Sequence, residues 1–104
     1  MSSFNLVLTD TARNDLKQIY NYLCKDNPKA AKLFIRDLVN KLFYLANNGV
    51  PGSARDNVSS GLRGFPYRKR CFYFRIIDNS MVVVRILHSA QDVDSQDFPP
   101  VHQS

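Results

Sequence analysis

The sequence contains no glutamate, and all nine of its acidic residues are aspartate. It contains only two cysteines, Cys24 and Cys71, which are too few for a disulfide framework. We therefore expect both to be free packing thiols and the protein to be cytoplasmic. No glycine-rich phosphate loop occurs, and no spacing of histidine and cysteine suits zinc. We expect no cofactor and no metal ion.

Long apolar runs are also absent, since none approaches the ~20 residues needed to span a bilayer. The N-terminus has no basic segment followed by an apolar one, so we expect no secretory signal and no membrane partner. A chain of 104 residues has room for one hydrophobic core. We assign residues 1–92 to a single domain and expect the tail 93–104, with its Pro99-Pro100 pair, to be flexible when free.

Two helices are predicted in the first half of the chain, after a β-prone strand at residues 4–8. Apolar residues recur at helical spacing over 10–25, behind Thr9 as the N-terminal cap. Asn27-Pro28 is a capping residue followed by a first helical residue, and Gly49 ends the second helix. The connection between the helices is short, so we expect an antiparallel hairpin.

Three strands are predicted in the second half, at about 61–66, 69–77 and 81–88, after a surface loop at 49–61. The resulting order is β-α-α-β-β-β. We expect an α+β fold in which the helix hairpin packs on a mostly antiparallel sheet.

The positive charge of the protein is concentrated in the predicted strands. Residues 57–91 carry one acid, Asp78, and six basic side chains, so this segment has a net charge of +5, equal to that of the whole chain. The basic residues are Arg63, Arg68, Lys69, Arg70, Arg75 and Arg85. A folded segment with this surplus is where an anionic partner would bind, although a solvated basic surface is the simpler interpretation.

The alternation of side chains predicts how the last two strands pair. Positions 72, 74 and 76 are all apolar, and so are 82, 84 and 86. These sets share one face if 76 pairs with 82, 74 with 84 and 72 with 86, around an Asp78-Asn79-Ser80 loop.

The opposite face then carries Arg75, Arg85 and Tyr73 among apolar neighbours. Its members are Cys71, Tyr73, Arg75 and Ile77 opposite Met81, Val83, Arg85 and Leu87. Burying an unpaired guanidinium costs several kcal/mol, so we expect this face to be open to solvent or to a partner. Alternatively, each arginine packs its stem on the sheet and keeps its head in water.

Metal-free cleavage of RNA is the one catalytic chemistry that these residues could support. It needs a base, an acid and a cation, which His88, Tyr73 and the arginines at 63, 75 and 85 could supply. His88 also has a structural interpretation, as an imidazole at the end of a strand.

Four segments carry a resemblance to a known family: TARNDLKQIY (11–20), GLRGFP (61–66), FYFRI (72–76) and VVRILHSAQD (83–92). Together they resemble the toxins of the RelE/ParE superfamily from bacterial type II toxin–antitoxin operons, in particular the ParE branch. The resemblance implies the α+β fold given above. It also implies neutralisation by a cognate antitoxin, ParD-like or of another type, whose C-terminal segment folds onto the toxin.

Two activities are implied by this resemblance. ParE-like members poison DNA gyrase without catalysis, and RelE-like members cut mRNA on the ribosome, here with Arg63, Arg85 and His88. The chain lacks glutamate, and Ser89, Ala90 and Gln91 stand where relatives more often have tyrosine or arginine. We therefore expect a non-enzymatic gyrase inhibitor without sequence-specific binding of nucleic acid, and the ribosome-dependent endonuclease is the alternative.

An apolar groove dotted with arginines suits an amphipathic, acid-containing antitoxin segment. The residues predicted to bind the antitoxin or the target are Arg63, Arg68, Lys69, Arg70, Tyr73, Arg75, Met81, Val83, Arg85 and Leu87.

Overall fold

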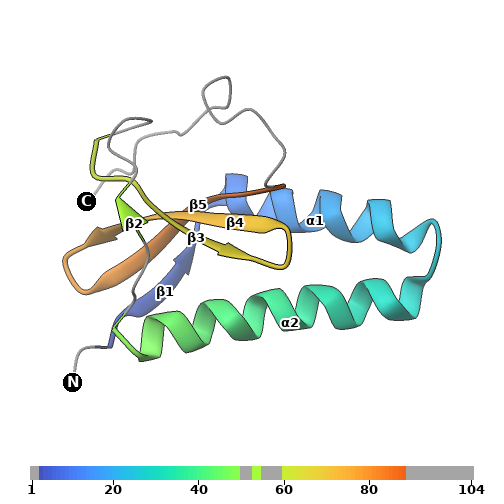
Figure 1. The fold of residues 1–104 in the computed structure, drawn as a ribbon, viewed down its shortest axis with the longest axis horizontal. Coiled ribbons are helices and arrows are strands. Elements are labelled where there is room, and N and C mark those ends of the chain that lie inside the picture. Colours follow the sequence, from blue (N-terminus) through green and yellow to red (C-terminus); the bar gives the residue numbers. More distant parts are fainter. Residues whose placement is uncertain (1–2, 50–52, 55–59, 89–104) are drawn as a thin grey trace.

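The computed structural model describes residues 3–49, 53–54 and 60–88. Two antiparallel helices cover one face of a sheet, in the α+β arrangement expected from the sequence (Figure 1). The predicted flexible tail, 93–104, and most of the predicted loop at 49–61 lie outside the described residues. In the part described, no helix is both long and apolar enough to cross a membrane.

The helices α1 (Asp10–Cys24) and α2 (Pro28–Asn47) begin at the predicted caps. The Thr9 hydroxyl accepts a hydrogen bond from the Ala12 N–H at 3.1 Å and donates one to the Val83 carbonyl at 3.0 Å. The Asn27 side chain accepts from the Ala30 N–H at 3.1 Å. Thr9 therefore begins a helix and ties it to the sheet, whereas Asn27 caps only its own helix.

The sheet is mixed and has the order β1-β5-β4-β3-β2. Its strands are β1 (Asn5–Leu8), β2 (Ser53–Ala54), β3 (Arg63–Tyr67), β4 (Arg70–Ile77) and β5 (Ser80–His88). Only β1 and β5 are parallel, so the sheet is mostly antiparallel as predicted. The strand β2, which is only two residues long, was not predicted from the sequence.

The pairing of β4 with β5 agrees with the prediction at one end only. Phe72 lies opposite Ile86 as expected, but Phe74 lies opposite Val83 and Ile76 opposite Met81, one residue away from the predicted partners. Tyr73 lies opposite Arg85 and the next residue, Phe74, lies opposite Val83, so Val84 is the extra residue of a β-bulge that separates the two registers. The turn is therefore Asp78-Asn79, one residue shorter than predicted.

The bulge changes which residues face the helices. Met81 and Val83 are fully buried in the main core with Phe72, Phe74 and Ile86. The prediction that Met81 and Val83 lie on the docking face was therefore wrong.

The face of the sheet away from the helices was expected to be open, but it carries a second buried cluster. This cluster consists of Leu62, Cys71, Tyr73, Val82, Val84 and Leu87. Tyr73 is only 6% exposed and Leu87 only 2%. The bulge places Val82 and Val84 on this side, so the face is more apolar than predicted and its side chains are shielded from water.

Candidate interaction site

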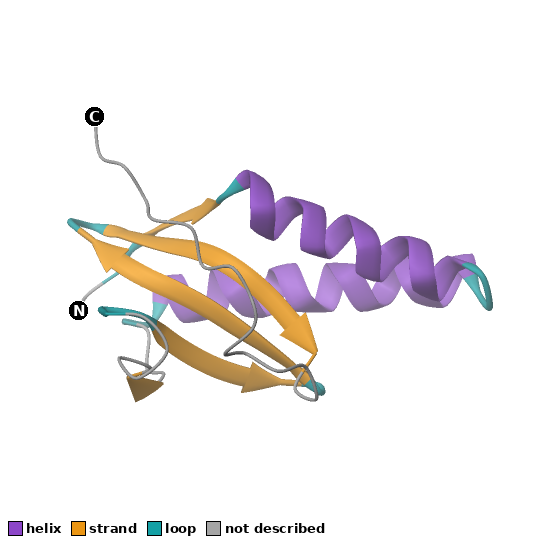
Figure 2. Ribbon diagram, turned by 90° about the horizontal axis from the view of Figure 1, so that it is seen from above, coloured by secondary structure: helices purple, strands orange, loops and turns teal. Residues whose placement is uncertain are grey.

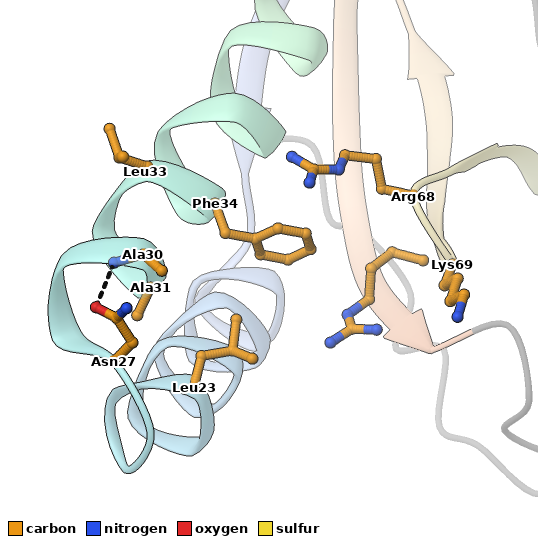
Figure 3. A pocket seen from close by; sticks show the side chains of 9 residues that line it. Leu23, Asn27, Ala30, Ala31, Leu33, Phe34, Arg68 and Lys69 are labelled. Atoms are coloured by element: carbon orange, nitrogen blue, oxygen red, sulfur yellow. Dashed lines mark hydrogen bonds between the residues drawn. The ribbon is translucent and has the colours of Figure 1, made fainter.

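A groove lies between the end of the helix hairpin and the turn that joins β3 to β4. The hairpin extends past the end of the sheet (Figure 2), and the turn faces it. The floor of the groove is apolar, and the whole hollow has a volume of about 520 Å³. We call it the hairpin groove; its floor is formed by Leu23 of α1 and by Ala30, Ala31, Leu33 and Phe34 of α2 (Figure 3).

The other side of the hairpin groove is cationic. Arg68 and Lys69 form the turn, and Arg70 begins β4. Arg68 has φ 50° and Lys69 has φ 63°, so both adopt the left-handed conformation. Two-residue hairpin turns with two positive φ angles favour Asn-Gly, because a side chain with Cβ costs about 1–2 kcal/mol per residue there. This turn therefore presents two cations at the expense of local stability.

The ring of Phe34 is close to two guanidinium groups, that of Arg68 in the turn and that of Arg70 in β4. The guanidinium carbon of Arg68 lies 4.8 Å from the centre of the Phe34 ring, and that of Arg70 lies 5.6 Å from it. In Figure 3 the ring of Phe34 points from α2 toward the basic side. These cation–π contacts connect the apolar floor of the groove with its cationic side, which we call the rim and which consists of Arg68, Lys69 and Arg70.

Asp37 holds the rim in place from α2. Its carboxylate accepts a hydrogen bond of 2.7 Å from Arg68 and one of 3.0 Å from the Tyr67 hydroxyl. The hydrogen bond from Arg68 is the main cause of the lowered pKa of Asp37, and the same carboxylate raises the pKa of Tyr67. Arg68 and Asp37 remain 49% and 39% exposed, so the pair orients the turn more than it stabilises the fold.

Arg70 differs from Arg68 in its hydrogen bonding. In the part of the chain that the structure describes, its buried Nε atom has no hydrogen-bond partner. Burial away from water lowers the pKa of this guanidinium. Arg70 also borders a second hollow of about 200 Å³ between α1 and the end of β5, so its side chain lies between two openings.

The second hollow contains Arg85 and His88, two of the three residues predicted for an endonuclease. Arg85 donates through Nε and Nη2 to the carboxylate of Asp15, at 2.9 and 3.1 Å. Its side chain is only 14% exposed and that of Asp15 only 8%. Because a carboxylate already neutralises Arg85, the positive charge of this hollow is reduced.

Arg63, the third of these residues, lies elsewhere. Arg63 lies opposite Phe74, whereas His88 lies opposite Arg70, which is four residues closer to the start of β4. At ~3.3 Å per residue, this is a separation of about 13 Å along the strand. The described structure therefore does not bring the three into one pocket.

The predicted docking residues separate into several groups. Arg68, Lys69 and Arg70 line the hairpin groove. By register Arg75 is on the face away from the helices, as is Arg85, which is opposite Tyr73. The predicted sharing of a face by Arg75 and Arg85 thus holds for the backbone, but the guanidinium of Arg85 is bound to α1. Leu33 also lines the groove and was not predicted from the sequence; its position outside the apolar stripe of α2 was the available signal.

No group of three or more metal-ligating side chains occurs within residues 3–49, 53–54 and 60–88.

Two solved structures have a similar fold. One is the chromosomal ParDE toxin–antitoxin system from P. aeruginosa, with a TM-score of 0.70, 24% identity, and coverage of 82% of this chain and 95% of that one. The other is the RelBE2 toxin–antitoxin complex from Mycobacterium tuberculosis, with a TM-score of 0.64, 22% identity, and coverage of 88% and 97%.

The fold is thus that of the RelE/ParE-like toxins. The sequence model of one family, described as ParE toxin of the type II toxin–antitoxin system parDE, matches residues 6–93. The chain belongs to the ParE toxin family. A search of the curated proteins finds no match.

Proposed function

We propose that this ParE-family toxin inhibits DNA gyrase, blocks replication without catalysing a reaction, and is neutralised by direct binding of its cognate antitoxin. The family match over residues 6–93 is the observation that carries the proposal. The separation of Arg63 from the hollow shared by Arg85 and His88 supports a non-catalytic mode of action. A cytoplasmic location follows from the proposed target.

Electrostatic attraction is expected to assist the binding of the toxin to the gyrase–DNA complex. The chain has a net charge of +5, and a gyrase–DNA complex carries the negative charge of its DNA. Complementary charge mainly accelerates association, so added salt should slow binding more than it accelerates dissociation.

A plasmid supercoiling assay tests the proposed target. Purified toxin is added to gyrase, relaxed plasmid and ATP, and the products are examined after detergent and protease treatment. We expect loss of supercoiling and accumulation of linear plasmid from trapped cleavage complexes. A sample with excess antitoxin is the control and should recover supercoiling. Unchanged supercoiling without linear plasmid would refute gyrase as the target.

The alternative activity is ribosome-dependent cleavage of mRNA, which the shared hollow of Arg85 and His88 favours. A translating extract distinguishes it from gyrase inhibition. Codon-positioned cuts that disappear with His88→Ala would establish the endonuclease.

A further inference from the structure

We propose that the second hollow, between α1 and the end of β5, binds one phosphodiester group of a DNA backbone, and that Arg70 is the cation that receives it. This inference rests on the gyrase–DNA target proposed above. It adds a direct contact between the toxin and the DNA, of a kind that does not depend on the base sequence.

A helix and a pair of strands form the walls of the second hollow. On α1, Asp15, Gln18 and Tyr22 follow one another at spacings of three and four residues, so they project from the same side of the helix. On the sheet, Arg70 lies opposite His88, where β4 begins and β5 ends. Directly opposed residues point to the same face, so a polar stripe of the helix meets a polar pair at the end of the sheet.

The charged residues that line this hollow leave one positive charge uncompensated. Asp15 neutralises Arg85 through hydrogen bonds of 2.9 and 3.1 Å. No other acid lines the hollow, and among the described residues none accepts a hydrogen bond from the buried Nε of Arg70. Burial lowers the pKa of Arg70, and an anion next to the guanidinium would favour its charged form. A phosphodiester carries a single negative charge, so one such group balances the surplus.

The accessible surface of the hollow favours a phosphodiester over an acidic peptide. Ile86 and Leu87 line it but are only 2% exposed, so they offer little surface to an apolar side chain of a partner. Gln18 and Tyr22 are exposed, and their amide and hydroxyl groups can donate to further oxygens of the anion. The hollow thus combines one cation with neutral donors, the kind of contact that proteins make to nucleic-acid phosphates.

The role of His88 in this site is small. Its imidazole borders the hollow but carries no charge in its neutral form. Its removal should therefore cost at most one neutral hydrogen bond. An RNA backbone offers the same phosphodiester chemistry, so the experiment compares both nucleic acids.

The test is the affinity of the full-length toxin for a short fluorescein-labelled DNA duplex, measured by fluorescence anisotropy over a range of salt concentrations. Gln18→Glu adds a carboxylate at a residue that lines the second hollow but not the hairpin groove. We expect affinity to fall by about tenfold at low salt and the salt dependence to decrease by about one phosphate contact. Gln18→Lys should raise the affinity and increase the salt dependence.

The matched controls are Asn40→Asp and Asn40→Lys, which make the same changes of charge at an exposed position of α2 that lines neither hollow. We expect their affinities to remain within about twofold of the wild type, because salt screens distant charges. Arg70→Gln removes the proposed receptor and should weaken binding by about tenfold. Arg36→Gln, which removes an exposed charge from α2, is its control and should have an effect of about twofold or less.

Several outcomes would overturn the proposal. They are a wild type that does not bind the duplex, equal effects at positions 18 and 40, and a dependence on position 18 that occurs with single-stranded RNA but not with DNA. Melting temperatures confirm that each variant is folded. Gyrase is absent from this measurement, so failure of the phosphate site is distinguishable from failure of the proposed target, which the supercoiling assay tests separately.

Discussion

Asp15 of α1 binds the side chain of Arg85 and also accepts a hydrogen bond of 2.9 Å from the backbone N–H of Ile86. The parallel pairing of β1 with β5 ends at Leu8 and Val83, so none of the described strands borders the next residues of β5 on that side. A single helix carboxylate therefore accepts from the Ile86 N–H at this strand edge and neutralises the neighbouring arginine.

Replacement of Asp15 with alanine should destabilise the fold strongly. The substitution leaves a guanidinium that is only 14% exposed without its carboxylate, and it removes the acceptor for Ile86. Breaking a buried ion pair on one side typically costs about 3–5 kcal/mol. We expect a loss of this size in the free energy of unfolding, measured by urea denaturation.

The double variant Asp15→Leu with Arg85→Met is the control for that prediction. Apolar residues of similar volume remove both charges, so the double variant should be more stable than Asp15→Ala. A loss below about 1 kcal/mol for Asp15→Ala would mean that the pair behaves like an exposed one.

Thr9 should contribute more to stability than the other helix cap, Asn27. Thr9→Ala removes the hydrogen bond from Ala12 and the one to the Val83 carbonyl, whereas Asn27→Ala removes an exposed cap only. We expect a loss of about 1–2 kcal/mol for Thr9→Ala and of about 1 kcal/mol or less for Asn27→Ala. Equal losses in thermal denaturation would show that the link between Thr9 and β5 contributes nothing.

His88→Ala should leave both folding and gyrase inhibition unchanged. His88 is exposed at the end of β5 and is outside the hairpin groove. We expect a melting temperature close to that of the wild type and a half-inhibitory toxin concentration within about twofold of it, as for a surface substitution that removes no charge. Loss of growth inhibition together with loss of mRNA cleavage would instead support the endonuclease.

The sequence predicted the elements of this fold well because their signals are local. The caps Thr9 and Asn27 and the spacing of apolar residues placed both helices within one or two residues. The bulge at Val84 could not be found in this way, because three successive valines at 82–84 fit either face of the sheet. The error in register then moved Met81 and Val83 to the wrong side.

The candidate site was predicted only in part, for a related reason. The run Arg68-Lys69-Arg70 is visible as charge in the sequence, but its apolar counterpart comes from residues more than 30 positions earlier. Phe34 fits a core position on its helix, and only the fold brings its ring near the two guanidinium groups. A contact between residues so far apart in the sequence is determined by the topology of the fold rather than by a local sequence pattern.

Asp37→Asn should weaken the fold near neutral pH and lose this effect in acid. The pKa of Asp37 is lowered from its ordinary value of 3.8, chiefly by the hydrogen bond from Arg68 and then by that from Tyr67. The unfolded chain therefore takes up this proton at a higher pH than the folded chain, and the stabilisation is lost as the pH falls below about 4. We expect the melting temperature of the wild type to exceed that of Asp37→Asn at about pH 6, and the difference to shrink toward about pH 3. Arg13→Asn, which leaves Asp37 and its partners in place, should show no such convergence, and a constant difference for Asp37→Asn would contradict the proposed origin of the shift.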